Sequence, residues 1–205
     1  VMSQASFSGD DLGSVFNRAM DLYNKEKYAP AIRLFDTYIK EGDQKDKISL
    51  AEAEYYAALS ALRLFNPDSE YRMIIYLSTH PESPKINEAN LALGDYFYQN
   101  KSYRKACSYY ETVNRYEIGN EKLPEYFFRY GYSLYIKGDK AKALMMFSEI
   151  KDIDTEYTAP AIYYFSHIAY EQKMYQTALE GFMKLKDDET FGSIVPFYIA
   201  QILYL

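Results

Sequence analysis

The side chains best suited to chemistry are few and lie far apart in this sequence. The only histidines are His80 and His167, and the only cysteine is Cys107. Cys107 follows Ala106 on a predicted helix, where an inert buried thiol is expected. His80 precedes Pro81 and suits a helix end, where its charge complements the helix dipole. No nucleophile has a base nearby and no metal-ligand spacing occurs, so the sequence predicts no enzyme, no metal site and no cofactor.

Aromatic residues are far more abundant than histidine and cysteine in this sequence. The 205 residues include 24 tyrosines and 12 phenylalanines but no tryptophan. A tyrosine ring packs through its faces and hydrogen-bonds at its tip. The chain is 48% hydrophobic and 25% charged, which predicts a globular protein. A net charge of −6 without a long basic run argues against nucleic-acid binding. No apolar run approaches the ~20 residues of a membrane helix.

One stretch, residues 127–147, shows how these rings are positioned. Apolar residues recur at helical spacing from Phe127 to Leu134, Gly138 and Asp139 break the run, and a second apolar face follows. A small residue on each helix, Gly131 and Ala143, would let the two backbones approach closely. One such helical hairpin cannot bury its own hydrophobic face, so it needs stacked copies of itself.

The rest of the chain supplies those copies. The first helix of each carries a small residue, at spacings of 39, 36, 37, 35 and 34 residues: Ala19, Ala58, Gly94, Gly131, Ser166 and Ala200. Four second helices carry an alanine in a shared register: Ala31, Ala106, Ala143 and Ala178. The second helix of the second copy lacks this alanine. No segment has the pattern of a strand, so we predict an all-α array of about five hairpins plus a sixth first helix.

The predicted boundaries follow this pattern. Residues 1–10 are a small, polar leader, and residues 11–205 form the array. Its repeats lie at about 12–43, 50–81, 86–119, 123–155 and 158–190, followed by a lone helix at 194–205. Val1, Met2 and Ser3 fit either the end of a secretory signal peptide or a flexible leader. The last helix is strongly apolar, so we expect a longer natural chain or self-association to cover it.

This pattern resembles the tetratricopeptide repeat (TPR) family. Two copies carry most of the resemblance: Leu93, Gly94, Phe97, Tyr103, Ala106 and Tyr110 in one, and Tyr130, Gly131, Leu134, Gly138, Ala143 and Phe147 in the other. The weak second repeat and the loss of the closing proline depart from the family pattern. The long connections look more like bacterial envelope members. The resemblance implies a right-handed superhelix whose first helices line a concave face.

On that face, one stripe lies three before, one after and four after each small residue. The candidate groove residues are Phe16, Met20, Tyr23, Tyr55, Leu91, Asp95, Tyr98, Phe128, Tyr132, Tyr135, Tyr163, His167, Tyr170, Phe197 and Tyr204. Rigid aromatic surface is typical of peptide-binding grooves. The alternative is that these rings pack against neighbouring first helices and only build the wall of the array. His167 is then a structural residue rather than a polar contact.

The resemblance favours a non-catalytic scaffold that binds a protein or peptide segment. The groove positions are aromatic or acidic, so a neutral, basic or apolar segment fits better than an anionic C-terminus. Carbohydrate binding is the alternative, with Asp95, Gln99 and Glu171 beside the rings. An enzymatic role would require a further domain. We expect a periplasmic or outer-membrane-associated location, and otherwise a cytoplasmic one.

Overall fold

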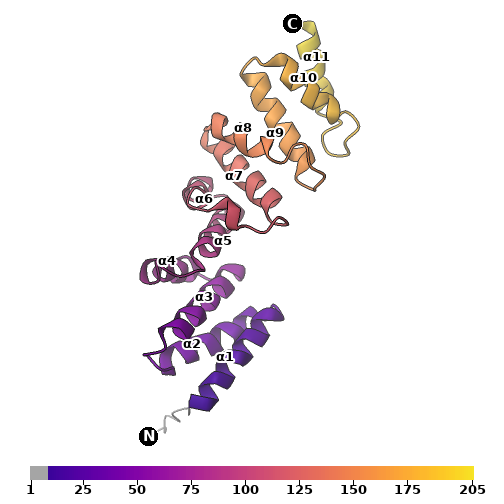
Figure 1. Cartoon of the computed structure of the whole chain (residues 1–205). Coiled ribbons are helices and arrows are strands. Elements are labelled where there is room, and N and C mark those ends of the chain that lie inside the picture. The colour runs from indigo at the N-terminus through magenta and orange to yellow at the C-terminus, as the bar shows by residue number, and fades with distance from the viewer. Residues whose placement is uncertain (1–8) are drawn as a thin grey trace. The chain divides into compact units, whose positions relative to one another are not determined.

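The computed structural model describes residues 9–205, which are helical wherever they are regular; no strand occurs among them (Figure 1). The predicted leader lies outside the described residues up to position 8, and residues 9 and 10 already belong to the first helix. The helices are α1 (Gly9–Asn24), α2 (Tyr28–Glu41), α3 (Lys47–Arg63), α4 (Ser69–Thr79), α5 (Ile86–Gln99), α6 (Tyr103–Tyr110), η1 (Arg115–Glu117), α7 (Leu123–Lys137), α8 (Lys140–Ser148), α9 (Thr158–Glu171), α10 (Tyr175–Lys184) and α11 (Val195–Tyr204).

The helices form five hairpins and a sixth first helix, which confirms the predicted fold class. The chain divides between Tyr96 and Phe97 into two compact units, called here the first unit and the second unit. Several helices that follow one another in the chain also pack on one another, such as α2 on α3 and α9 on α10. The right-handed superhelix implied by the family resemblance stays a prediction.

All five hairpins have the same backbone structure at the turn between their two helices. The residue seven after each small residue has a positive φ, between 53° and 95°: Glu26, Phe65, Lys101, Gly138 and Lys173. In the fourth hairpin, Gly138 N–H donates to the Tyr135 carbonyl and Asp139 N–H donates to the Leu134 carbonyl. Equivalent pairs of bonds close the other four turns. This is the Schellman motif, which satisfies the last carbonyls of a helix and reverses the chain.

A second repeated feature packs each hairpin together. A small residue and a large one, four positions apart, lie fully buried on every second helix: Ala31 and Phe35, Ser69 and Met73, Ala106 and Tyr110, Ala143 and Phe147, Ala178 and Phe182. The sequence pattern did not identify Ser69 as the small residue of its helix. The degenerate second repeat has this residue one position earlier than the others, because one residue fewer separates it from the turn residue Phe65.

Close approach of the backbones is visible at two hairpins. A Cβ atom on Gly131 of α7 would lie 2.9 Å from Phe147 Cε1 and 3.1 Å from Met146 Cβ on α8. In the fifth hairpin the roles are reversed, because a Cβ atom on Gly181 of α10 would lie 1.8 Å from Ser166 Oγ on α9. A larger residue on one helix is thus matched by a glycine on the other, which keeps the interior densely packed.

The predicted small positions on the first helices are buried at Ala19, Ala58, Gly94, Gly131 and Ser166. Ala200 is the exception, because it is exposed on α11. Among the described residues α11 has no second helix of its own after it, so Ala200 lies at no crossing within a hairpin.

Candidate functional site

The predicted groove residues of the second unit form a continuous set of rings on α5, α7 and α9. We call them the aromatic stripe: Tyr98, Phe128, Tyr132, Tyr135, Tyr163, His167 and Tyr170. All seven are half-buried. The predicted residues on α11 are more open, since 63% of Phe197 and 95% of Tyr204 is exposed. The second unit therefore has partly exposed rings on α5, α7 and α9 and more exposed rings on α11.

The stripe rings also contact the next first helix. The ring centroids of Tyr132 and Tyr135 on α7 each lie 5.2 Å from that of Tyr164 on α9. Phe128 lies 5.6 Å from Tyr157, which directly precedes α9. These contacts match the wall-packing alternative, yet they leave part of every ring open to solvent. The same residues thus build the wall and form its surface.

Three tyrosines that carry much of this packing were missed in the sequence. They lie two before the small residue of a first helix: Tyr56, Tyr164 and Tyr198. Each stacks on the large residue of the preceding second helix. Tyr56 lies 6.0 Å from Phe35 at an interplanar angle of 18°. Tyr164 lies 5.8 Å from Phe147 at 20°, and Tyr198 lies 4.9 Å from Phe182 at 14°. The recurrence of a tyrosine two positions before the small residue in three repeats could have identified them from the sequence.

In α7 the same position holds Arg129 instead of a tyrosine. Its guanidinium carbon lies 5.4 Å from the centre of the Tyr98 ring, within the range of a cation–π contact. Arg129 also forms an ion pair with Glu125, one turn earlier on α7. The charge of the guanidinium is therefore balanced, and the stripe gains no net positive charge there.

A polar cluster interrupts the stripe between α7 and α9. The Tyr135 hydroxyl lies 3.4 Å from His167 Nδ1, and Glu171 Oε2 lies 3.7 Å from the same nitrogen. Lys140 Nζ of α8 is 2.8 Å from Glu171 Oε2. The ring of His167 also lies 5.5 Å from that of Tyr198. His167 is held by protein groups, and Glu171, a candidate sugar-binding residue, is already ion-paired.

Burial keeps two tyrosines of the stripe neutral well above neutral pH. Burial raises the pKa of Tyr98 and of Tyr163 to about 12. Burial also raises the pKa of Tyr164, and its interactions with Tyr132 add to that effect. At the end of the stripe, the Tyr170 hydroxyl donates to Gln201 Oε1 at 2.8 Å. The rings thus offer apolar faces and neutral hydroxyls to a ligand.

In the described part of the first unit, fewer of the predicted groove positions carry rings. Tyr55 was predicted to face the groove, but it is buried. Its ring packs 5.5 Å from Tyr76 of its own hairpin, and its hydroxyl donates to Glu88 Oε2 at 3.1 Å. The other predicted groove positions of this unit are half-buried: Phe16, Met20, Tyr23, Leu91 and Asp95. Only Phe16 and Tyr23 among them carry rings.

The remaining candidates for chemistry have structural surroundings. Cys107 is buried, and burial raises the pKa of its thiol, which lowers its reactivity. His80 ends α4, and its Nε2 lies 2.5 Å from Glu54 Oε2. In the described part of the chain, no three histidine, cysteine or carboxylate side chains are grouped to hold a metal ion. Of the helices in residues 9–205, none is both long and apolar enough to cross a membrane.

Comparison with solved structures shows a likeness of fold. No protein-family model and no curated protein matches the chain. A crystal structure of a thermophilic TPR protein from Thermus thermophilus is similar, with 19% sequence identity and a TM-score of 0.44. The match covers 95% of this chain and all of the other. At that TM-score it carries no argument of its own. The hairpin array is TPR-like in its repeat length and its buried small residues, as residues 9–205 themselves show.

Proposed function

We propose that the chain is a non-catalytic scaffold that binds a protein or peptide segment along the aromatic stripe of the second unit. The observation that carries this proposal is the incomplete burial of the stripe. All seven side chains contact other rings yet stay partly exposed, and Phe197 and Tyr204 of α11 are exposed. Large, rigid aromatic surface with neutral hydroxyls binds protein segments at a low cost in conformational entropy.

The charges near the stripe favour a neutral or apolar segment. Glu125 is paired with Arg129 and Glu171 is paired with Lys140, so neither carboxylate is left to select a strongly basic ligand. An apolar or aromatic side chain can pack against the rings, while main-chain amides of the segment bond the tyrosine hydroxyls.

Photo-crosslinking tests this proposal. A photoreactive phenylalanine analogue replaces Phe197 of α11 or, as a control, Ile48 of the first unit, which is 83% exposed and lies outside the pocket of that unit. In an extract of the source organism, we expect a crosslinked protein from position 197 only. The double variant Tyr135→Ala/Tyr170→Ala should abolish that crosslink. Crosslinking at both positions, or at neither, would overturn the proposal. Retention on a glycan resin in place of a protein crosslink would favour carbohydrate binding.

A stability measurement separates binding from packing. The stripe double variant should lose less than about 2 kcal/mol of unfolding free energy, since both rings are partly exposed. Tyr164→Ala is the structural comparison, because it removes the ring stacked on Phe147 and should cost roughly 2 kcal/mol by itself. A double variant that melts as readily as Tyr164→Ala would support wall packing as the main role of the stripe.

We further propose a location in the bacterial envelope. Only the family resemblance of the long connections supports this. Fractionation of the source organism with an antibody to the chain tests it, and recovery of the protein solely in the cytosol would refute it.

A further inference from the structure

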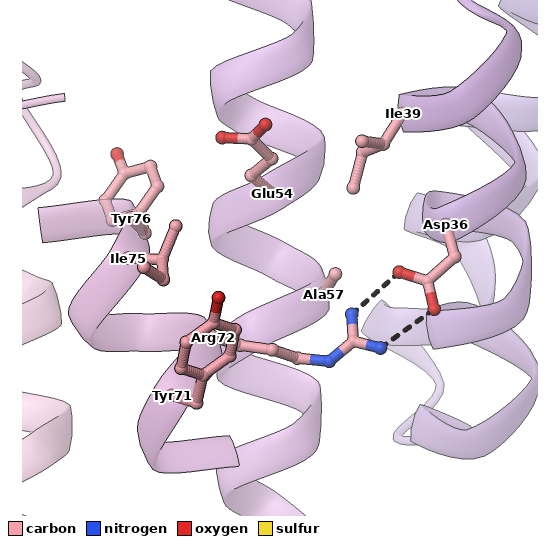
Figure 2. A pocket seen from close by; sticks show the side chains of 8 residues that line it. All are labelled: Asp36, Ile39, Glu54, Ala57, Tyr71, Arg72, Ile75 and Tyr76. Carbon is pink, nitrogen blue, oxygen red and sulfur yellow. Dashed lines mark hydrogen bonds and ion pairs between the residues drawn. The ribbon is translucent and has the colours of Figure 1, made fainter. Parts of the chain in front are cut away.

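Three helices of the first unit, α2, α3 and α4, enclose a pocket that the aromatic stripe does not use (Figure 2). Its lining residues are Asp36, Ile39, Glu54, Ala57, Tyr71, Arg72, Ile75 and Tyr76. Its volume is about 210 Å³. Sites for whole small molecules usually measure roughly 300–1,000 Å³, so this pocket has the size for a single side chain.

Arg72 is the one permanently charged cation in the pocket lining, and it is already paired with carboxylates. Arg72 reaches from α4 past Ala57 to α2, where its Nη1 and Nη2 donate to the two oxygens of Asp36 at 2.7 and 3.0 Å (Figure 2). Its Nε donates to Asp68 Oδ2 at 2.6 Å. Two carboxylates therefore surround one guanidinium, and this group excludes an anionic ligand rather than attracting it.

A third carboxylate makes the pocket negative. Glu54 on α3 stands apart from the Arg72–Asp36 pair in Figure 2, and its Oε2 lies 2.5 Å from the Nε2 atom of His80. The three carboxylates of Asp36, Glu54 and Asp68 exceed the charge of Arg72 by two units. Carboxylate oxygens can accept further hydrogen bonds, so a cationic donor has acceptors available.

The walls between these carboxylates are apolar. Ile39 and Ile75 line the pocket, and 40% of Ile75 is exposed. Tyr71 lies one turn before Ile75 on α4 and is more exposed still. Lysine and arginine combine an aliphatic stem with a charged head, and such side chains pack their stems on apolar surface while the head bonds polar groups.

We propose that this pocket binds a lysine or arginine side chain from a protein partner. The stem packs between Ile39 and Ile75, and the charged head bonds the carboxylates of Glu54 and Asp36. An apolar neighbour in the same segment covers the exposed ring of Tyr71. This basic anchor site lies in the first unit and is independent of the aromatic stripe, so either proposal can fail alone.

Methyl NMR of the complete chain tests the basic anchor site. The probe is a blocked pentapeptide, acetyl-Gly-Leu-Arg-Leu-Gly-amide, and its control has neutral citrulline in place of arginine. We expect saturable shifts of the Ile39 and Ile75 methyl signals, with at least fivefold weaker binding of the citrulline peptide. Equal binding of the two peptides, or no saturable shift at these methyls, would overturn the proposal.

Three variants sharpen the test. Glu54→Gln keeps the shape and a bond to His80 but removes the charge, and should weaken binding at least fivefold. Glu52→Gln changes an exposed carboxylate of α3 outside the pocket and should leave affinity unchanged. Ile75→Lys places a cation at the pocket and should abolish binding. Equal effects of the two glutamine variants would show a general charge attraction and refute a built site. Equal affinity for free putrescine would assign the pocket to small polyamines instead.

Discussion

The two units share one helical frame but expose different chemistry. Both repeat the left-handed turn residue and the buried small–large pair on the second helix. In α3 of the first unit, the positions one and four after the small residue are Leu59 and Leu62, and both are buried. In α9 of the second unit they are His167 and Tyr170, which stay partly exposed.

The difference shows that frame and surface are separate sets of residues. The frame requires a small residue where helices cross and a tolerated positive φ at the turn. Those requirements leave the adjoining positions free to be aliphatic, aromatic or charged. The first unit has a polar pocket between α2, α3 and α4, and the second unit has rings along its first helices. A binding role can thus differ between repeats without a change of fold.

Alkaline pH should produce the largest difference in stability between the two units. Among the described residues, the pKa is raised for three tyrosines of the first unit: Tyr23, Tyr55 and Tyr76. It is raised for seven of the second: Tyr98, Tyr103, Tyr126, Tyr130, Tyr135, Tyr163 and Tyr164. A raised folded-state pKa contributes stability that is complete below the unfolded pKa of about 10 and is lost as the pH rises through the folded pKa.

For Tyr98 and Tyr163 the window of loss runs from about pH 10 to about pH 12. We expect the second unit to unfold first in this window. Tyrosine-labelled NMR with far-UV circular dichroism measures it, and the same titration in concentrated urea is the control. Ionisation of Tyr163 near pH 10 with full helicity would contradict the prediction.

The next largest effect should come from overpacking a helix crossing. Gly131→Leu places a side chain where even a Cβ would lie 2.9 Å from Phe147, so we expect a loss of roughly 3 kcal/mol. Gly13→Leu in the first unit is the control, because no atom lies within 4 Å of its Cβ position and leucine favours a helix. Urea denaturation followed by circular dichroism compares them. Equal midpoints would show that the α7–α8 crossing is not tight.

The smallest effect should be a gain in unfolding free energy that occurs in both units. Glu26 in the first and Lys173 in the second have φ values of 57° and 61°, which cost a residue with a Cβ more than glycine. We expect Glu26→Gly and Lys173→Gly each to raise the unfolding free energy by about 0.5 kcal/mol. The alanine variants at both positions should give no gain. Chemical denaturation of the four variants measures these differences, and a gain at only one position would mean that the two units do not share the same turn.

Part of the fold could be predicted from the sequence, because it depends on residues that are close neighbours in the chain. Gly131, Ala143 and the mid-thirties period give the hairpins, since helical spacing places such residues on one face. The left-handed residue was recognisable at Gly138 but not at Lys101, where the side chain gives no signal for it. Ser69 was missed because the turn before it is one residue shorter.

The sequence alone determined the all-helical class, the five hairpins with a sixth first helix, and most of the small residues that are buried on the helices. These features follow from local spacing of small, apolar and turn residues. Only the tertiary structure decided that Tyr164 stacks on Phe147, that Tyr55 is buried, and that Arg72 reaches Asp36 to form a pocket wall. Each of these joins different helices, and the packing of those helices decides which side chains meet.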